Sequence, residues 1–408
     1  MKSLLTLGLV LAAAAAGAQN APATAPAVPA AQPVFNDSLA QTPPAGPTSP
    51  VSIPGMAGPL TINPNPLAFK SKLLGTVYVS GVASSLFQVQ TNAVSGDKTF
   101  RSDISNGQIF IQKNAGVVQF FVQVGGYAVP ALGVASIRSG LATDDFFGVF
   151  PQGYLKIAPT RNFSVQVGKL PTLMGAEYTF SFENMNIQRG LLWNQENAVN
   201  RGVQLNYTAG PVVFAVAYND GQYSKKYNWL SGAATIALNS TNSLALIATG
   251  SLSRTDIATS ATPLYQNNEQ LYNLIYTRTA GPWTFQPYLQ YTYVPASPVI
   301  GTTQKGTTAA AAVLASYAVP NSGLRLPFRL EYLASTGEAE QGAPNLLYGA
   351  GSNAFSITAT PTYQYERFFG RTELSFVQAT HTAEGAAFGA AGNSASQSRA
   401  LLEVGVLF

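Results

Sequence analysis

The chain has 408 residues, of which 10% are charged and 46% are hydrophobic, and its formal net charge is +4. Soluble domains carry about a quarter charged residues. The composition therefore favours one large structure with a lipid-facing outer wall and a polar, mostly uncharged inner wall over two soluble domains. The positive charge forms no basic block, which argues against a nucleic-acid partner. Without cysteine, and with His381 as its single histidine, the chain is expected to hold no metal or other cofactor.

The N-terminal residues have the organisation of a secretory signal peptide over residues 1–18. Lys2 precedes an apolar run, and Ala-Gly-Ala ends at Ala18, so we expect cleavage before Gln19. Residues 19–71 are rich in Ala and Pro and lack apolar periodicity, which predicts a disordered segment in the periplasm. The sequence has no run of about 20 apolar residues, so no transmembrane helix is expected.

From residue 72 to 408 the sequence alternates between apolar and polar residues in segments that we interpret as transmembrane strands. Their lengths match the roughly 9 to 11 residues that cross a bilayer at a tilt. The sixteen predicted strands are 75–89, 106–113, 115–124, 152–158, 161–169, 202–209, 211–219, 228–238, 242–253, 268–279, 282–294, 306–318, 323–335, 353–366, 369–381 and 398–408. Seven short and eight long connections are strictly interleaved between them. This pattern is typical of an all-β fold, an antiparallel up-and-down barrel with long outer loops and short periplasmic turns.

Individual strands predict which face meets lipid. In residues 324–332, Leu, Phe and Tyr side chains occupy one face, and Arg325, Arg329 and Glu331 occupy the other. The charged face suits a wet lumen, and the aromatic face suits a membrane wall with interfacial girdles. Prolines within three strands each remove a ladder donor, so we expect bulges or missing bonds there. These prolines are Pro287, Pro327 and Pro361.

The connection 170–201 is a long non-periodic stretch with more charge per residue than the rest of the chain. A segment of this length without secondary structure in a compact domain is usually functional. Two arrangements stay open: an exposed loop with solvated charges, or a loop that folds into the lumen and lines its narrowest part. In the second arrangement the candidate constriction residues are Lys169, Glu177, Glu183, Arg189, Glu196 and Arg201.

Charged strand residues of inward parity are further candidates for pore chemistry, because fixed charges set ion preference at short range. They are Lys156, Arg325, Arg329, Arg371, Glu331, Glu366, Glu373 and Glu403. Four basic and four acidic groups predict weak discrimination between anions and cations. Alternatively, the arginines and glutamates form a structural ladder that stiffens the wall.

The final segment places Leu402, Val404, Val406 and Phe408 on one face. A terminal aromatic residue on an amphipathic last strand is the signal by which outer-membrane barrels are recognised, so we expect the barrel assembly machinery to bind at Phe408.

Three stretches, SVQVGKLPTLMGAEY (164–178), RGLLWNQENAVNRGVQLNY (189–207) and, more loosely, QPYLQYTYV (286–294), resemble the OmpL-like outer-membrane porins (porin-2 type) of Gram-negative bacteria. The resemblance covers residues 72–408 in general layout. It implies a passive diffusion pore for small hydrophilic solutes or ions in the cell outer membrane. The long Ala/Pro-rich segment departs from the family pattern, so solute preferences are not carried over.

Two other function classes stay open. A structural or adhesive barrel without an open pore is favoured by the N-terminal segment alone. An enzyme needs a nucleophile with a base, or a metal, and the sequence holds no GxSxG, HExxH or GxxxxGK[ST] motif, so we expect no enzyme. The expected partners are outer-membrane lipid, the assembly machinery and small solutes; no sequence marker decides whether a homo-oligomer forms.

Overall fold

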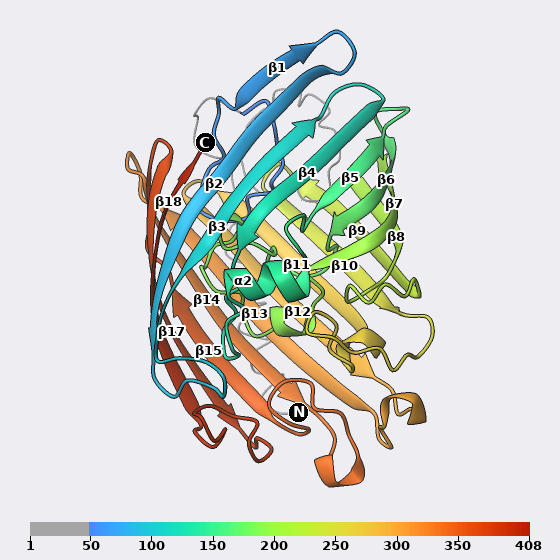
Figure 1. The fold of residues 1–408 in the computed structure, drawn as a ribbon, viewed down its shortest axis with the longest axis vertical. Coiled ribbons are helices and arrows are strands. Elements are labelled where there is room, and N and C mark those ends of the chain that lie inside the picture. Colours follow the sequence, from blue (N-terminus) through green and yellow to red (C-terminus); the bar gives the residue numbers. More distant parts are fainter. Residues whose placement is uncertain (1–48) are drawn as a thin grey trace. The chain divides into compact units, whose positions relative to one another are not determined.

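The computed structural model describes residues 49–408, so the predicted signal peptide and residues 19–48 lie outside the described residues. The described chain forms one closed antiparallel barrel of 16 strands (Figure 1). Its strands are β2 (Gly75–Gln90), β3 (Phe100–Lys113), β4 (Val118–Tyr127), β5 (Gly153–Ile157), β6 (Phe163–Pro171), β7 (Val199–Ala209), β8 (Val212–Asn219), β9 (Trp229–Asn239), β10 (Asn242–Ser251), β11 (Gln270–Ala280), β12 (Trp283–Val294), β13 (Gly306–Ala318), β14 (Leu324–Ser335), β15 (Asn353–Ala359) with β16 (Thr362–Tyr365), β17 (Phe368–Thr380) and β18 (Ser396–Leu407).

The barrel closes where β18 pairs with β2, from Arg399 opposite Gln90 to Leu407 opposite Val82. Each predicted strand overlaps an observed one, and the predicted fold class is confirmed. A short strand, β1 (Leu67–Ser71), extends the sheet by pairing with the start of β2. Short helices lie in the connections: α2 (Ser139–Leu141), η1 (Ala142–Phe146), η2 (Ser181–Glu183), η3 (Trp193–Gln195), η4 (Gln266–Asn268), η5 (Pro298–Ile300) and η6 (Ala339–Gln341). Within residues 49–408, no helix is both long and apolar enough to cross a membrane.

The prolines within the strands interrupt the hydrogen-bond ladder between strands, as expected. Pairing between β11 and β12 skips from Ile275 opposite Tyr288 to Arg278 opposite Phe285, which leaves Pro287 without a partner on that side. Pro361 separates β15 from β16, and both pieces pair with the same neighbour, β17. They therefore form a single crossing of the wall.

The two faces of the wall follow the alternation in the sequence. On β14, Arg329 and Glu331 are 0% and 2% exposed, whereas Leu326 and Tyr332 are 42% and 38% exposed. The polar set therefore points into the lumen, and the apolar set faces outward, where a membrane would cover it.

Residues 49–66 lie against the inner wall at the short-turn end of the barrel, a path that differs from the disordered segment predicted for residues 19–71. Side chains of the wall bind their carbonyl groups: Gln112 Nε2 donates to Ile53 O over 2.6 Å, and Asn114 Nδ2 donates to Pro50 O over 2.6 Å. Val51 and Leu60 are buried. Composition misses this because an extended chain held through its backbone carbonyls needs no apolar period. We call residues 49–66 the N-terminal plug segment.

Candidate functional site

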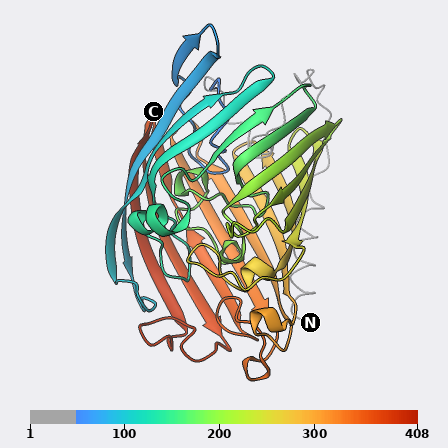
Figure 2. The ribbon, with the colours of Figure 1, turned by 45° about the vertical axis from the view of Figure 1, so that its right-hand side comes forward.

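Residues 172–198, which connect β6 to β7, fold into the lumen. The green connection lies inside the barrel in Figures 1 and 2. Its four charged side chains are between 0% and 6% exposed: Glu177, Glu183, Arg189 and Glu196. Of the two arrangements left open by the sequence, the structure has the inward one. We call residues 172–198 the lumen loop. Because buried charges require partners, its charged side chains are expected to pair with groups of the barrel wall.

One side of the barrel binds the lumen loop through an ion pair and through hydrogen bonds of charged side chains. Arg329 Nη1 of β14 lies 2.5 Å from Glu177 Oε1 of the loop, and Arg329 Nε lies 3.1 Å from Glu331 Oε2 of its own strand. Arg329 also donates to Gln188 O over 2.8 Å. Gly190 of the loop lies against Glu331, because a Cβ added at Gly190 would stand 2.1 Å from Glu331 Oε1. Only a glycine lets the backbone approach this closely.

Charged side chains of β17 bind backbone groups of the lumen loop. Arg371 of β17 donates to Ser181 O, Asn184 O and Met185 O over 2.8 to 2.9 Å, and its guanidinium lies 3.3 Å from Glu403 of β18. Glu373 accepts hydrogen bonds from the backbone N–H groups of Ile187 and Gln188. Removing one partner of a buried charge pair costs about 3–5 kcal/mol. We call the inward face of β14 to β18 the anchoring wall.

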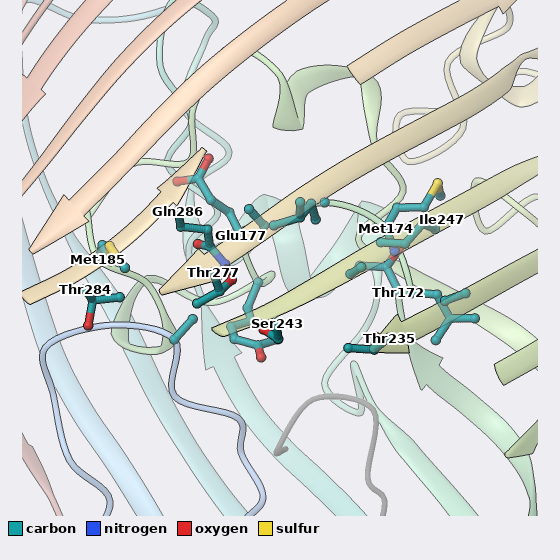
Figure 3. Close-up of a pocket in the computed structure, with 18 of the residues that line it drawn as sticks. Thr172, Met174, Glu177, Met185, Thr235, Ser243, Ile247, Thr277, Thr284 and Gln286 are labelled. Atoms are coloured by element: carbon teal, nitrogen blue, oxygen red, sulfur yellow. Dashed lines mark hydrogen bonds between the residues drawn. The ribbon is translucent and has the colours of Figure 1, made fainter. Parts of the chain in front are cut away.

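The opposite side of the barrel carries small, neutral inward side chains. Between this side and the loop lies a cavity of about 100 Å³, the inner cavity (Figure 3). Its labelled lining residues on β9 to β12 are Thr235, Ser243, Ile247, Thr277, Thr284 and Gln286, and those on the loop are Thr172, Met174, Glu177 and Met185. Ala57 of the N-terminal plug segment also lines it. Small side chains therefore leave space here, whereas the long charged side chains of the anchoring wall fill theirs.

A second cavity, of about 370 Å³, lies among the long connections and is called the vestibule cavity. Aromatic side chains from two connections form part of its wall, namely Phe146, Phe147 and Trp193. Its polar lining includes Glu196 of the loop and Gln222 of the β8–β9 connection. Pockets that bind small molecules combine mostly apolar walls with a few polar groups in this way.

Glu196 separates the two cavities. It lines the vestibule cavity, and its carboxylate accepts a hydrogen bond from the hydroxyl of Tyr288 on β12. Gly175, which lines the inner cavity, lies against the same carboxylate: a Cβ there would be 1.8 Å from Glu196 Oε2. Burial raises the pKa of Glu196 to about 8; the hydrogen bond from Tyr288 opposes this rise and the nearby Glu177 carboxylate adds to it.

Several predicted candidates lie elsewhere. Lys169 and Arg201 face each other across β6 and β7 with the parity of the exposed Val167 and Val203, and so they lie on the outer face of the wall. Arg201 pairs with Asp220 over 3.0 Å. Both were predicted to line the constriction because the non-periodic stretch was taken to run from Gly168 to Gly202. The strands reach Pro171 and begin again at Val199, so the alternation continues through both cations.

The remaining inner-wall candidates divide by position. Lys156 of β5 is buried and points inward, and Arg325 of β14 is half-buried near the short-turn end. Glu366 does not belong to the inner wall: it is exposed and has φ +50° in the turn between β16 and β17. The predicted structural ladder of arginines and glutamates exists in part. Its side chains bind the lumen loop as well as the barrel wall.

Phe408 completes the closure of the barrel. Its N–H donates to Gly81 O over 2.9 Å, and Gly81 N–H donates to Phe408 O over 2.7 Å. The ring covers Gly81, where a Cβ would lie 2.4 Å from Phe408 Cζ. The terminal aromatic residue therefore ties the end of the chain to β2, while its role as an assembly signal stays a prediction.

Sequence reasoning missed Tyr288 and the N-terminal plug segment as parts of the site. Tyr288 has the inward parity of Gln286 and Gln290, which is the signal that could have identified it. No pattern in the sequence indicates which inward side chain meets the loop.

A closed barrel with an apolar outer face, a polar interior and a loop folded into the lumen defines a transmembrane β-barrel of the outer-membrane porin class. The sequence model of the beta-barrel porin-2, OmpL-like family matches residues 76–408, and the chain belongs to this family. A comparison with curated protein sequences finds no match.

Solved structures show the same fold. Outer-membrane expressed OmpT of Vibrio cholerae superposes with a TM-score of 0.56 at 13% identity, covering 84% of this chain and 100% of that one. The outer membrane channel DcaP of Acinetobacter baumannii superposes with a TM-score of 0.57 at 12% identity, covering 83% of this chain and 99% of that one. At these identities the likeness concerns the fold alone.

Proposed function

We propose that the protein is a passive diffusion channel of the outer membrane for small hydrophilic solutes or ions, and that solutes pass along β9 to β12. The observation that carries this proposal is the unequal inner wall. One ion pair and several hydrogen bonds from charged side chains fix the lumen loop to β14 and β17, whereas small neutral side chains leave the inner cavity beside β9 to β12.

The proposed route has a defined order. A solute enters the vestibule cavity from the long-loop end, meets the partition formed by Glu196, Tyr288 and Gly175, reaches the inner cavity and leaves past Ala57. Neutral hydrogen bonds hold the loop on this side, such as that from Gly175 N–H to Asn273 Oδ1 over 3.1 Å. Such a bond contributes about 0.5–1.5 kcal/mol. The loop is therefore expected to separate from β9 to β12 more readily than from the anchoring wall.

Cysteine scanning in planar bilayers tests the route, because the natural chain has no cysteine. Ser243→Cys places a thiol on the inner cavity, and Ser375→Cys places one on the anchoring wall, where the serine contacts Gln188 over 3.2 Å. After reaction with a cationic methanethiosulfonate, single-channel conductance is expected to fall for the first variant and to stay at the parent value for the second. The reverse result would move the route to the other wall.

A barrel that serves a structural role without an open pore is the alternative that the N-terminal plug segment favours. The same recordings separate the two. If the full chain, inserted and heat-modifiable, gives no conductance steps in 1 M KCl, the channel proposal fails.

A further inference from the structure

We propose that the vestibule cavity is a binding site for an organic cation with an apolar or aromatic body, and that Glu196 and Glu269 provide the attraction for its positive charge. This inference rests on the proposed channel function, since it names the solute class that the entrance of the route would select.

The walls of the vestibule cavity fit the body of such a solute. Its volume is about 370 Å³, and apolar side chains from four connections form most of its surface. They include Val129, Ile137, Phe147, Trp193, Leu346 and Leu347. This volume lies within the range of about 300–1,000 Å³ that is usual for small-molecule sites. A purely hydrophilic solute would make no favourable apolar contact with these walls.

Two buried carboxylates beside the cavity lack a cationic partner. Glu196 lines the cavity and is 6% exposed, and Glu269 is 0% exposed behind Gln222, which lines the cavity and donates to Glu269 Oε1 over 3.4 Å. Among residues 49–408 neither forms a salt bridge, in contrast to Glu177, Glu331 and Glu403. Each also has one oxygen, Oε2, without a hydrogen-bond partner in this part of the chain.

The local charges favour a cation. Glu196 and Glu269 raise each other's energy when ionised, since each adds a negative charge to a region of low dielectric. Three cationic groups of the connections and of β7 have other contacts: Arg254 Nη1 donates to Asn268 O over 2.8 Å, Arg201 pairs with Asp220, and Arg189 lies over the ring of Trp193. An entering cation would relieve the repulsion between the two carboxylates. An anion would increase it.

Trp193 adds a second point of recognition. Its indole Nε1 is buried and has no hydrogen-bond partner among the described residues, and its ring belongs to the cavity wall. The Arg189 guanidinium already lies 5.3 Å from the centre of that ring, so Trp193 contributes apolar contact with the hydrocarbon body of the solute rather than a second cation–π contact.

An organic cation fits these groups better than a metal ion. No group of three or more His, Cys, Asp and Glu side chains in residues 49–408 has an arrangement that could hold a metal. Two carboxylates beside an apolar cavity instead match an ammonium or guanidinium group attached to a hydrocarbon body.

Calorimetric titration of the detergent-solubilised full chain at pH 9, where Glu196 is ionised, tests the site with three probes that share a benzyl group: benzyltrimethylammonium, benzyl alcohol and phenylacetate. Benzyltrimethylammonium is expected to bind at least about tenfold more tightly than the other two, since it alone brings a positive charge to the two carboxylates; a factor of ten corresponds to about 1.4 kcal/mol. Glu196→Gln and Glu269→Gln should each remove about tenfold of this affinity. Glu384→Gln, at an exposed carboxylate in the β17–β18 connection, is the matched control and should bind like the parent.

The outcomes separate this inference from the proposed function. Equal binding of the three probes, or unchanged affinity in both carboxylate variants with heat-modifiable folding intact, overturns the cation site. If the parent conducts KCl but benzyltrimethylammonium added at the long-loop end neither binds nor blocks, the channel stands and the site fails. If the probe binds as expected while the parent never conducts, the site stands and the channel proposal fails.

Discussion

Tyr288 of β12 donates a hydrogen bond to Glu196 of the lumen loop, and this contact joins the wall to the loop between the two cavities. Both residues are buried, at 2% and 6% exposed. The partition therefore depends on one hydrogen bond between a neutral donor and a carboxyl group, together with the packing of Gly175. The strength of this hydrogen bond should decide how readily the route opens.

Replacing Tyr288 by Phe removes this hydrogen bond and keeps the ring. At pH 9, where Glu196 is ionised, a hydrogen bond to this charged group contributes about 1.5–3 kcal/mol, so the open probability in planar bilayers is expected to rise by about tenfold or more. Tyr291→Phe, on the outward face of the same strand, is the control. Equal open probability in Tyr288→Phe and the parent would show that the partition does not limit conduction.

Replacing Arg329 by Met is expected to release the lumen loop from the anchoring wall. Glu177 and Glu331 then stay buried without their shared cation, at a cost of about 3–5 kcal/mol. We expect a lower midpoint of heat-induced unfolding on semi-native gels and noisier, larger conductance steps. Arg325→Met, four positions earlier and half-buried, should change neither. A stable, quiet channel in Arg329→Met would show that the loop is held by other contacts.

Gly58→Val tests whether the N-terminal plug segment narrows the short-turn end. A Cβ at Gly58 would lie 2.1 Å from Asn184 O of the lumen loop, so valine cannot occupy the site without moving the segment. Conductance should therefore increase, and Gly140→Ala, where a Cβ meets nothing within 4 Å, should leave it unchanged. If Gly58→Val conducts like the parent, the segment does not limit the route.

The strands could be predicted because each half-buried strand repeats with period two, and Arg329 and Glu331 were placed on the inner face for that reason. The direction of the lumen loop could not be predicted. It depends on contacts such as Arg371 with Ser181 O, which join residues 190 positions apart in the chain. The wrong placement of Lys169 and Arg201 in the constriction has a similar cause. A shift of two residues in a strand boundary decides whether a side chain belongs to a loop or to the barrel wall.

Phe408→Ser should reduce the amount of folded barrel in the outer membrane. The ring covers Gly81 at the seam between β18 and β2, so its loss weakens the closing pair as well as the predicted assembly signal. Phe355→Ser removes an exposed aromatic side chain from the outward face of β15, away from the seam, and serves as the control. Equal heat-modifiable fractions of Phe408→Ser and the parent would contradict the role of the terminal residue.

The ion preference of the channel should depend on pH through Glu196. Its pKa is raised by burial to about 8, so the side chain is mostly neutral at pH 6 and ionised at pH 9. The groups that face it are Tyr288 of β12, Glu177 of the loop and Glu331 of β14, with Glu269 also close enough to interact. Since none of these is a cation, ionisation adds uncompensated negative charge to the route.

The reversal potential under a low-salt KCl gradient should therefore shift toward K⁺ selectivity as the pH rises from 6 to 9. Low salt is required because at 1 M the screening length falls to about 3 Å. Recordings in a His381→Asn background remove the single histidine, and Glu196→Gln in that background should flatten the pH dependence around 8. A shift toward Cl⁻ with rising pH, or an equal pH dependence with and without Glu196, would show that this carboxyl group does not face the permeating ions.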